Sequence, residues 1–536
     1  MMSAVPDWLD TSWHHARTKG HICGHQPSTK DALVLIVEDC LMKKHLITTV
    51  SAFTLALATQ AHANDSDIDQ MGVANEATVD QTLGNEGISI VKQDGNENLA
   101  EVTQSEVPTI GSVVFGTPGN VADINQLGDN ARARIEQNST DPNSAGTTNT
   151  AKISQNSSGL AQVPPDGVPS TYSINGRIIQ NGTGNNSEIS QSGTPTTDGG
   201  SGITARNDQD GASNTSIISQ APNNDDASPY TDADVTQIGD SNISNVLQNG
   251  SNADIDVTQT GNNNDSYVNQ GFRRDMTAVV DQLSDDSKSV IDQDAQGVTS
   301  TVMQTGSAQM STISQLTGSL ESTATVTQGG TGNTSTITQS IANAEAVVDQ
   351  SGSGGISVID QSKEGGQPFP GIGGFASLTD TGIGNNSYIG QMGDSHSATV
   401  TMGGDSNIGD VRQSGTMMTA TVSQLGSTGL STIVQKDGSG STATLLQAGS
   451  GNINKITQMG DTQSAMVTQD GTGNGSTITQ MGDTHSATVT QAMSGNTSLI
   501  WQEGSGNTAT VSQIVTAGNL SDVFQSGSGN IATVMQ

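Results

Sequence analysis

Residues 502–513 read Gln-Glu-Gly-Ser-Gly-Asn-Thr-Ala-Thr-Val-Ser-Gln, and this stretch carries a spacing that recurs through most of the chain. Its fixed positions are Gln502, Gly504, Asn507, Ala509, Val511 and Gln513. The same residue types stand at the same spacing in residues 70–81 and in residues 525–536. We take this spacing of 11 residues as the template that decides the fold.

Glutamine marks the repeat most clearly. It recurs every 11 residues, with occasional steps of 12 or 13, from Gln237 to Gln361 and again from Gln424 to Gln536. Some units replace the asparagine of the template by another polar residue, as at Gln463 and His485. A fixed period of this kind indicates a stacked repeat architecture rather than a series of globular domains.

The template predicts one strand and one turn per unit. Asn, Ala, Val and Gln occupy alternate positions, so they share one face of a strand, and Ser and Thr occupy the other face. The glycine supplies the positive φ that a tight turn requires. Because so short a strand cannot bury a face alone, we expect equivalent strands to stack. Ala and Val would then lie inside, and Gln and Asn would form ladders of amide hydrogen bonds.

Two units, about 22 residues, would make one coil of strand, turn, strand and turn. The turns often alternate in type, as between Gly-Thr-Gly-Asn at 471–474 and Gly-Asp-Thr at 482–484, which favours a two-sided coil over a three-sided one. The predicted fold is therefore an all-β solenoid of stacked strand-turn-strand coils. The ladder residues expected from the template are Gln70, Asn75, Gln81, Gln237, Asn242, Gln248, Gln447, Asn452, Gln458, Gln469, Asn474, Gln480, Gln491, Gln502, Asn507, Gln513, Gln525, Asn530 and Gln536.

Composition excludes several classes of protein. Apolar residues make up 31% of the chain and aromatic residues 2%, which is too little for a large aliphatic core. The chain must either stay disordered or fold through a repeat whose interior accepts small and polar side chains. The net charge of −35 repels nucleic acid and anionic membranes, so we expect no nucleic-acid partner.

Residues 42–63 have the three parts of a secretory signal peptide: Met42-Lys43-Lys44-His45, an apolar stretch, and Ala61-His62-Ala63 as the cleavage site. Residues 1–41 share no repeat with the rest, and we interpret them as a mis-called upstream extension. The remainder divides into irregular repeats at 64–232, regular repeats at 233–361, a Gly/Pro-rich insertion at 362–383 and regular repeats at 384–536. Insertions in a solenoid map to turns, so the stack need not be interrupted.

The sequence offers no candidate for catalysis, and we expect no catalytic residue, cofactor or metal. Both cysteines precede residue 63. His396 and His485 each lie in a Gly-Asp-x-His-Ser segment, and we interpret them as solvated turn residues. The acidic turns at 223–226 and 263–265 lack the calcium-binding patterns of β-helices and EF-hands, so we interpret them as charged turns that oppose edge-to-edge aggregation.

The spacing Gln-x-Gly-x-x-Asn-x-Ala-x-Val-x-Gln resembles the curlin repeat of bacterial curli fibres, and the resemblance covers nearly all of residues 68–536. The chain would be an unusually long member, without the Gly-rich segment that usually follows the signal peptide of curlins. The resemblance implies a curlin-like solenoid, export through an outer-membrane secretion pore, and assembly with a curli-type nucleator.

We therefore expect a secreted, non-enzymatic structural protein that polymerises with itself into extracellular amyloid fibres at the bacterial cell surface, for biofilm matrix and adhesion. Gln536 completes a repeat and no cap is visible, so strand addition end to end is the expected mechanism. The alternative is a monomeric solenoid that acts as a surface adhesin or ice-binding protein. It would use an outward Thr-x-Thr face, for which the candidate pairs are Thr399/Thr401, Thr488/Thr490, Thr477/Thr479 and Thr336/Thr338.

Overall fold

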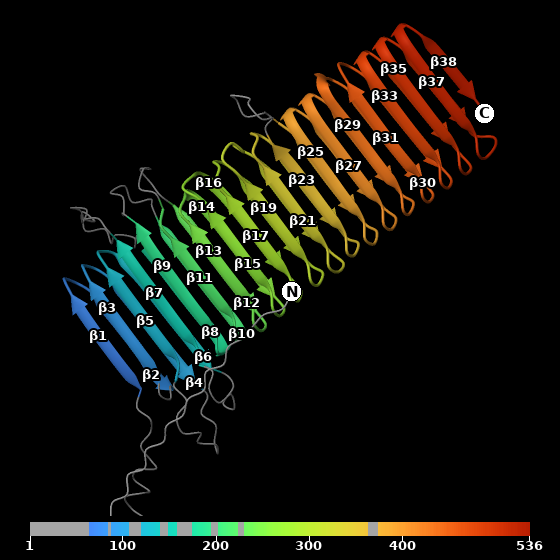
Figure 1. The fold of residues 1–536 in the computed structure, drawn as a ribbon. Coiled ribbons are helices and arrows are strands. Elements are labelled where there is room, and N and C mark those ends of the chain that lie inside the picture. Colours follow the sequence, from blue (N-terminus) through green and yellow to red (C-terminus); the bar gives the residue numbers. More distant parts are fainter. Residues whose placement is uncertain are drawn as a thin grey trace, which may run out of the picture. The chain divides into compact units, whose positions relative to one another are not determined.

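The computed structural model describes residues 64–83, 87–106, 119–139, 148–157, 174–193, 202–222, 230–362 and 373–536. The expected signal peptide at 42–63 and the expected extension at 1–41 lie outside these residues. All regular structure in the described ranges is β-strand, in 38 strands. Consecutive strands belong alternately to two sheets, and we call these the odd sheet and the even sheet after the strand numbers (Figure 1).

The odd sheet holds β1 (Asp65–Met71), β3 (Ile88–Asp94), β5 (Val121–Leu127), β7 (Thr150–Ser157), β9 (Asn186–Gly193), β11 (Thr215–Gln220), β13 (Ile243–Gln248), β15 (Asp265–Gln270), β17 (Lys288–Gln293), β19 (Met310–Gln315), β21 (Thr334–Gln339), β23 (Ile356–Ser362), β25 (Asn386–Asp394), β27 (Ile408–Thr416), β29 (Leu430–Ser439), β31 (Ile453–Met459), β33 (Gly475–Asp483), β35 (Thr497–Ser505) and β37 (Leu520–Ser528).

The even sheet holds β2 (Glu76–Leu83), β4 (Leu99–Glu106), β6 (Ala131–Ser139), β8 (Ile174–Thr183), β10 (Ile203–Ala212), β12 (Thr231–Ile238), β14 (Ser251–Thr260), β16 (Arg274–Gln282), β18 (Thr299–Gln304), β20 (Thr323–Gln328), β22 (Glu345–Gln350), β24 (Phe375–Asp380), β26 (Ser397–Met402), β28 (Thr419–Gln424), β30 (Thr442–Ala448), β32 (Ser464–Asp470), β34 (Ser486–Gln491), β36 (Thr508–Gln513) and β38 (Ile531–Met535).

Every strand pairs in parallel with the next strand of its own sheet, and equivalent template positions lie opposite one another. Gln469 on β32 is opposite Gln491 on β34, which is opposite Gln513 on β36. The pairs run in chain order from β2–β4 to β36–β38 in the even sheet and from β1–β3 to β35–β37 in the odd sheet. One coil is therefore two strands, and the predicted two-sided β-solenoid is confirmed.

The core is a thin layer between the two sheets, and its two walls differ in composition. Even strands bury the Ala and Val of the template, as Ala487 and Val489 do on β34. Odd strands bury Ser and Ile instead, as Ser476 and Ile478 do on β33. Each wall therefore combines one small and one branched side chain, which lets the sheets approach closely while the β-branched residues fill the layer.

The template glycine is required by its backbone and by the neighbouring coil. Gly482 and Gly504 have φ values of 110° and 108°, which disfavour any residue with a Cβ. A Cβ on Gly482 would also lie 1.9 Å from the carbonyl oxygen of Gly504, and one on Gly504 would lie 2.0 Å from that of Gly527. The turns can stack at the spacing of the strands only because these positions carry no side chain.

The insertions interrupt the turns and leave the sheets continuous. Residues 140–147 lie between β6 and β7, which belong to opposite sheets, yet β6 pairs with β8 and β7 pairs with β9. The expected insertion at 362–383 is too long, because β24 (Phe375–Asp380) lies inside it and pairs with β22 and β26. The period of the glutamines did not predict this strand, because Asp380 stands where the template has Gln.

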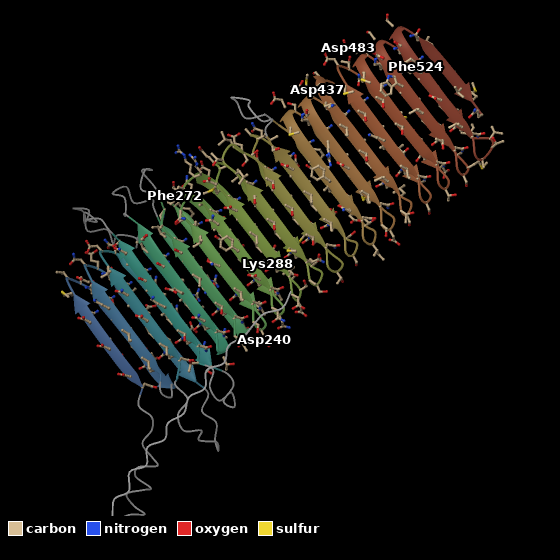
Figure 2. All side chains as sticks on the ribbon, viewed as in Figure 1. Asp240, Phe272, Lys288, Asp437, Asp483 and Phe524 are labelled. Atoms are coloured by element: carbon tan, nitrogen blue, oxygen red, sulfur yellow. The ribbon has the colours of Figure 1, made fainter. Side chains whose placement is uncertain are left out.

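The turns form two edges along the stack. One edge holds the turns that follow odd strands, and Phe272, Asp437 and Asp483 are seen along it (Figure 2). The other edge holds the turns that follow even strands, and Asp240, which follows β12, is seen there. Among the described residues, none forms a helix of the length and apolar character needed to cross a membrane.

Candidate assembly site: the buried amide ladders

The odd sheet contains an unbroken ladder of glutamines, one from each strand. Each Nε2 donates to the Oε1 of the glutamine on the next odd strand toward the C-terminus, at 2.6–3.1 Å, from Gln70 through to Gln525. All donors point the same way along the stack. The ladder therefore has a direction, as the parallel strands do.

The second hydrogen of each amide joins the two sheets. Gln480 Nε2 donates to the carbonyl oxygen of Ser464 at 3.0 Å, and Gln502 Nε2 donates to that of Ser486 at 3.0 Å. These carbonyls belong to the even sheet, so each buried glutamine ties its coil to the next coil and its sheet to the opposite sheet. A buried primary amide with both hydrogens used avoids the desolvation penalty that would otherwise exclude it from a core.

The even sheet has the same ladder with one interruption. Its links run from Gln81 to Gln350 and resume from Gln424 to Gln536, at 2.6–3.3 Å. Asp380 and Met402 fill the two positions between them. The Oε1 of Gln424 and the Oδ2 of Asp380 are buried without a hydrogen-bond partner.

Each substituted position is matched by a glycine from the opposite side of the coil, Gly355 directly before β23 and Gly409 on β27. The Oδ2 of Asp380 lies 2.2 Å from where a Cβ of Gly355 would be, and the Cε of Met402 lies 2.5 Å from where one of Gly409 would be. Asp380, which is 1% exposed, accepts hydrogen bonds at Oδ1 from Asn385 Nδ2 at 2.6 Å and from the Gly382 amide at 3.1 Å. Burial raises the pKa of its carboxyl above the ordinary value.

Asparagines form further rows along the two edges. Asn507 Nδ2 donates to the carbonyl oxygen of Glu503 in its own turn at 3.0 Å and to that of Gly527 in the next coil at 3.0 Å. Its Oδ1 accepts the backbone N–H of Asn530 at 2.9 Å. One side chain thus closes its turn and binds the following turn, which explains why the template places Asn three residues after Gly.

The structure corrects the interpretation of the two histidines as solvated turn residues. His396 and His485 are 2% and 1% exposed, because they occupy the asparagine position. The Nδ1 of His485 accepts the backbone N–H of Asn507 at 3.2 Å, and its Nε2 lies 3.0 Å from the carbonyl oxygen of Met481. An imidazole that carries a hydrogen at Nε2 therefore reproduces two of the three interactions of the template asparagine, the contact with its own turn and the acceptance of the N–H of the next coil.

His396 makes the equivalent pair of contacts. Its Nδ1 lies 3.4 Å from the backbone nitrogen of Met418, and its Nε2 lies 3.0 Å from the carbonyl oxygen of Met392. Burial lowers the pKa of its imidazole, and this outweighs the opposing effect of the backbone contacts and of Asp394.

The structure distributes the expected ladder residues over four rows. Those on the odd glutamine ladder are Gln70, Gln248, Gln458, Gln480, Gln502 and Gln525. Those on the even glutamine ladder are Gln81, Gln237, Gln447, Gln469, Gln491, Gln513 and Gln536. Those in the turns that follow odd strands are Asn75, Asn507 and Asn530, and those in the turns that follow even strands are Asn242, Asn452 and Asn474.

The outward faces of the two sheets differ. The four Thr-x-Thr pairs do not share a face, because Thr399/Thr401 and Thr488/Thr490 lie on the even sheet, whereas Thr336/Thr338 and Thr477/Thr479 lie on the odd sheet. From β24 to β36 most outward positions of the even sheet are Ser or Thr, and Asp470 at the end of β32 is charged. On the odd sheet Trp501 and Phe524 are adjacent outward partners on β35 and β37.

No group of three or more His, Cys, Asp or Glu side chains within the described ranges is placed to hold a metal ion. In the acidic turn at 263–265, Asn263 donates to Asp286 at 3.2 Å, and Asp265 forms an ion pair with Lys288 at 2.8 Å. The acidic turn at 223–226 lies outside the described residues.

The two sheets and their ladders define a parallel β-solenoid in which one structural unit repeats along the chain, an architecture that indicates a structural role. The family model of the curlin associated repeat matches residues 455–482, 461–492 and 486–514. The C-terminal region of the solenoid therefore carries curlin repeats. No curated protein matches the chain.

Proposed function

We propose that the chain is a secreted structural subunit that assembles with itself into extracellular, curli-like amyloid fibres for a biofilm matrix and for adhesion to surfaces. The observation that carries the proposal is the uniform direction of the odd ladder. Every coil presents to the next coil the same row of parallel strand edges and amide groups. A second molecule added in register would meet the same partners that each coil meets within the chain.

The direction of the ladder also sets how subunits would join. Amide donors face one end of the stack and acceptors the other, so only head-to-tail addition continues the hydrogen bonds. Fibres built in this way are polar. The charge of −35 would keep the subunit soluble before assembly, and the acidic turns would disfavour lateral pairing of edges.

The expected signal sequence supports secretion, and the curlin resemblance supports an outer-membrane pore and a nucleator as partners. These partners and the extracellular location belong to the proposal. The uniform direction of the ladder supports self-assembly, which can be tested with the purified chain alone.

The experiment is seeded growth of the purified full chain, followed by thioflavin fluorescence and by fibre diffraction. We expect seeds to abolish the lag, reflections near 4.7 and 10 Å, and unequal growth rates at the two ends of seeds carrying a different fluorophore. A chain that folds and stays monomeric under the same conditions would overturn the proposal.

A second function is favoured by one observation, the face of the even sheet between β24 and β36, on which most outward residues are Ser or Thr. A monomer could use this flat, regular face to bind an ordered surface such as ice. Thermal hysteresis of the monomeric chain that is lost on replacing Thr399 and Thr488 by Lys would support this function, and its absence in the wild-type chain would rule it out.

A further inference from the structure

The outward face of the even sheet carries two blocks of opposite charge next to each other. We define the arginine block as the basic residues of β6, β8 and β10, which are Arg132, Arg134, Arg177 and Arg206. We define the aspartate block as the outward carboxylates of β12 and β14, which are Asp232, Asp234, Asp254 and Asp256. Arginine and lysine are scarce in this chain, so a cluster of four arginines is unusual for it.

The strand register places three of the arginines and two of the aspartates in one column. Arg134 lies opposite Arg177, Arg177 opposite Arg206, Arg206 opposite Asp234, and Asp234 opposite Asp256. Successive residues of the column are one strand spacing apart, about 4.8 Å. The charge therefore changes sign once along this column, between β10 and β12.

Within the chain the arginine block is only partly neutralised. Arg134 lies 3.3 Å from Glu136, Glu101 lies 3.8 Å from Arg132 and 3.9 Å from Arg134, and Arg206 forms an ion pair with Asp208. Arg177 lies between them and has no ion pair with any residue that the structure describes, and its Nε is buried without a hydrogen-bond partner. A stacked guanidinium in this position has capacity for an external carboxylate.

The aspartate block repels itself. Asp232 lies opposite Asp254, and Asp234 lies opposite Asp256. Partial burial, followed by the neighbouring carboxylates, raises the pKa of Asp234 to about 6 and that of Asp232 and Asp256 in the same direction. An external cationic surface would relieve this repulsion.

We propose that this face binds a second copy of the chain, so that the arginine block of each copy covers the aspartate block of the other. The two copies are related by a twofold axis that lies between their faces, parallel to the strands, at the boundary between β10 and β12. Rotation about such an axis keeps a residue's position along the strand and reverses its position along the stack. Strand β10 then faces β12 of the second copy, β8 faces β14, and β6 faces β16.

This arrangement brings the arginines of each copy next to the aspartates of the other. Arg177 meets the partner's Asp254 and Asp256, and Arg206 meets the partner's Asp232 and Asp234. The same contacts form twice, as twofold symmetry requires. The second copy is the favoured occupant because one surface supplies both signs of charge in matching columns, whereas an unrelated cationic partner would leave the arginine block uncovered.

The pairing is lateral and sets the two stacks antiparallel, so it is distinct from head-to-tail growth. It requires only the folded chain and does not rest on the proposed fibre assembly. Its contacts are between charges near the surface, so added salt should weaken it.

The test is sedimentation velocity of the freshly dissolved full chain in the presence of a chelator, before fibres form. We expect dimers at low ionic strength and a dissociation constant at least ~10-fold weaker in 0.5 M salt. The first variant carries Arg177→Glu and Arg206→Glu, and the second carries Asp234→Arg and Asp256→Arg. Each variant alone should be monomeric, and an equimolar mixture should restore a dimer that contains one copy of each.

The matched control carries Lys436→Glu and Lys455→Glu, which change the net charge as the first variant does but lie on β29 and β31 of the odd sheet. The control should dimerise like the wild-type chain. Circular dichroism establishes that each variant is folded. Folded variants whose mixture stays monomeric would overturn the proposal, as would a wild-type chain that stays monomeric at low salt or that dimerises only when a divalent cation replaces the chelator.

Discussion

Asp380 on β24 and Met402 on β26 lie opposite each other in the strand register. They occupy the position at which the remaining even strands carry glutamine. They divide the even ladder into two runs, whereas the odd ladder passes the same coils without a break. The neighbouring Gln424 is left with an unpartnered Oε1. The even sheet therefore lacks part of its amide hydrogen bonding at these coils.

Restoring the ladder at this point should stabilise the protein. The double change Asp380→Gln and Met402→Gln removes a buried carboxyl and supplies the missing donors and acceptors. We expect the free energy of unfolding to rise by about 1–3 kcal/mol, the range for two to three recovered hydrogen bonds. Urea denaturation measures the change. Met402→Leu, which adds no amide, is the control and should bring no gain.

Removing one amide from an intact ladder should have the opposite effect. Gln480→Leu keeps the volume but leaves the Nε2 of Gln458 without its acceptor and the Oε1 of Gln502 without its donor. Two unsatisfied buried groups predict a loss of about 2–5 kcal/mol. Hydrogen exchange should localise the loss to β31, β33 and β35. Thr479→Val changes the adjacent outward side chain and should alter stability by less than ~0.5 kcal/mol.

Two glycines of neighbouring turns should tolerate substitution very differently. Gly482→Ala places a Cβ 1.9 Å from the Gly504 carbonyl oxygen, whereas a Cβ on Gly473 meets nothing within 4 Å. Gly473→Ala should cost only the ~1 kcal/mol of a left-handed alanine, and Gly482→Ala should cost ~3 kcal/mol or more because the turns must separate. Equal losses in thermal unfolding would contradict the stacking argument.

His396 should make stability fall in mild acid. Burial lowers the pKa of its imidazole below 6.5, so the unfolded chain binds a proton at a higher pH than the native chain does. The stability it contributes is complete above about pH 6.5 and is lost as pH falls toward the native pKa. His396→Asn restores the template and should remove this loss. The free energy of unfolding of the wild-type chain and of this variant is compared between pH 7.5 and 5. The difference reports the contribution of His396, because both chains have the same carboxyl groups.

The contribution of Asp234 to the pH dependence of stability should have the opposite sign to that of His396. Burial raises its pKa from 3.8 to about 6, so the native chain takes up a proton before the unfolded chain does. The ionised group destabilises the fold above about pH 6, and this penalty disappears as pH falls through that value. Because the side chain is half-buried, we expect Asp234→Asn to stabilise by only ~1 kcal/mol at pH 7.5. The gain should vanish at pH 4, as measured by urea denaturation.

The coil could be predicted from the sequence because the features that determine it lie within a single repeat. The period of the glutamines, the alternation of Ala, Val and Gln, and the glycine turns all lie within one repeat, and each follows from strand and turn geometry. The burial of His485 was not predicted, although the template had placed it in the asparagine position. Its environment depends on the backbone N–H of Asn507, which lies one coil away.

The arginine block could not be predicted from the sequence for a related reason. Arg134 and Arg177 are neighbours in the sheet, yet irregular insertions separate them in the chain, and no period of 11 connects them. The position of Asp380 does not follow from the period of the glutamines, and only the pairing of its strand with β22 and β26 reveals it. Side chains that depart from the template can be placed only when the strand register is known.

Two strands per coil also restrict how such a chain can change length. Duplication of a single 11-residue unit would send every later strand to the opposite sheet and reverse its direction, and the Ser/Ile and Ala/Val walls would exchange places from that point onward. Duplication of two units leaves every later residue in its own wall. Growth of this gene by tandem copying is therefore expected to proceed in even steps, and a family of such chains should differ in whole coils.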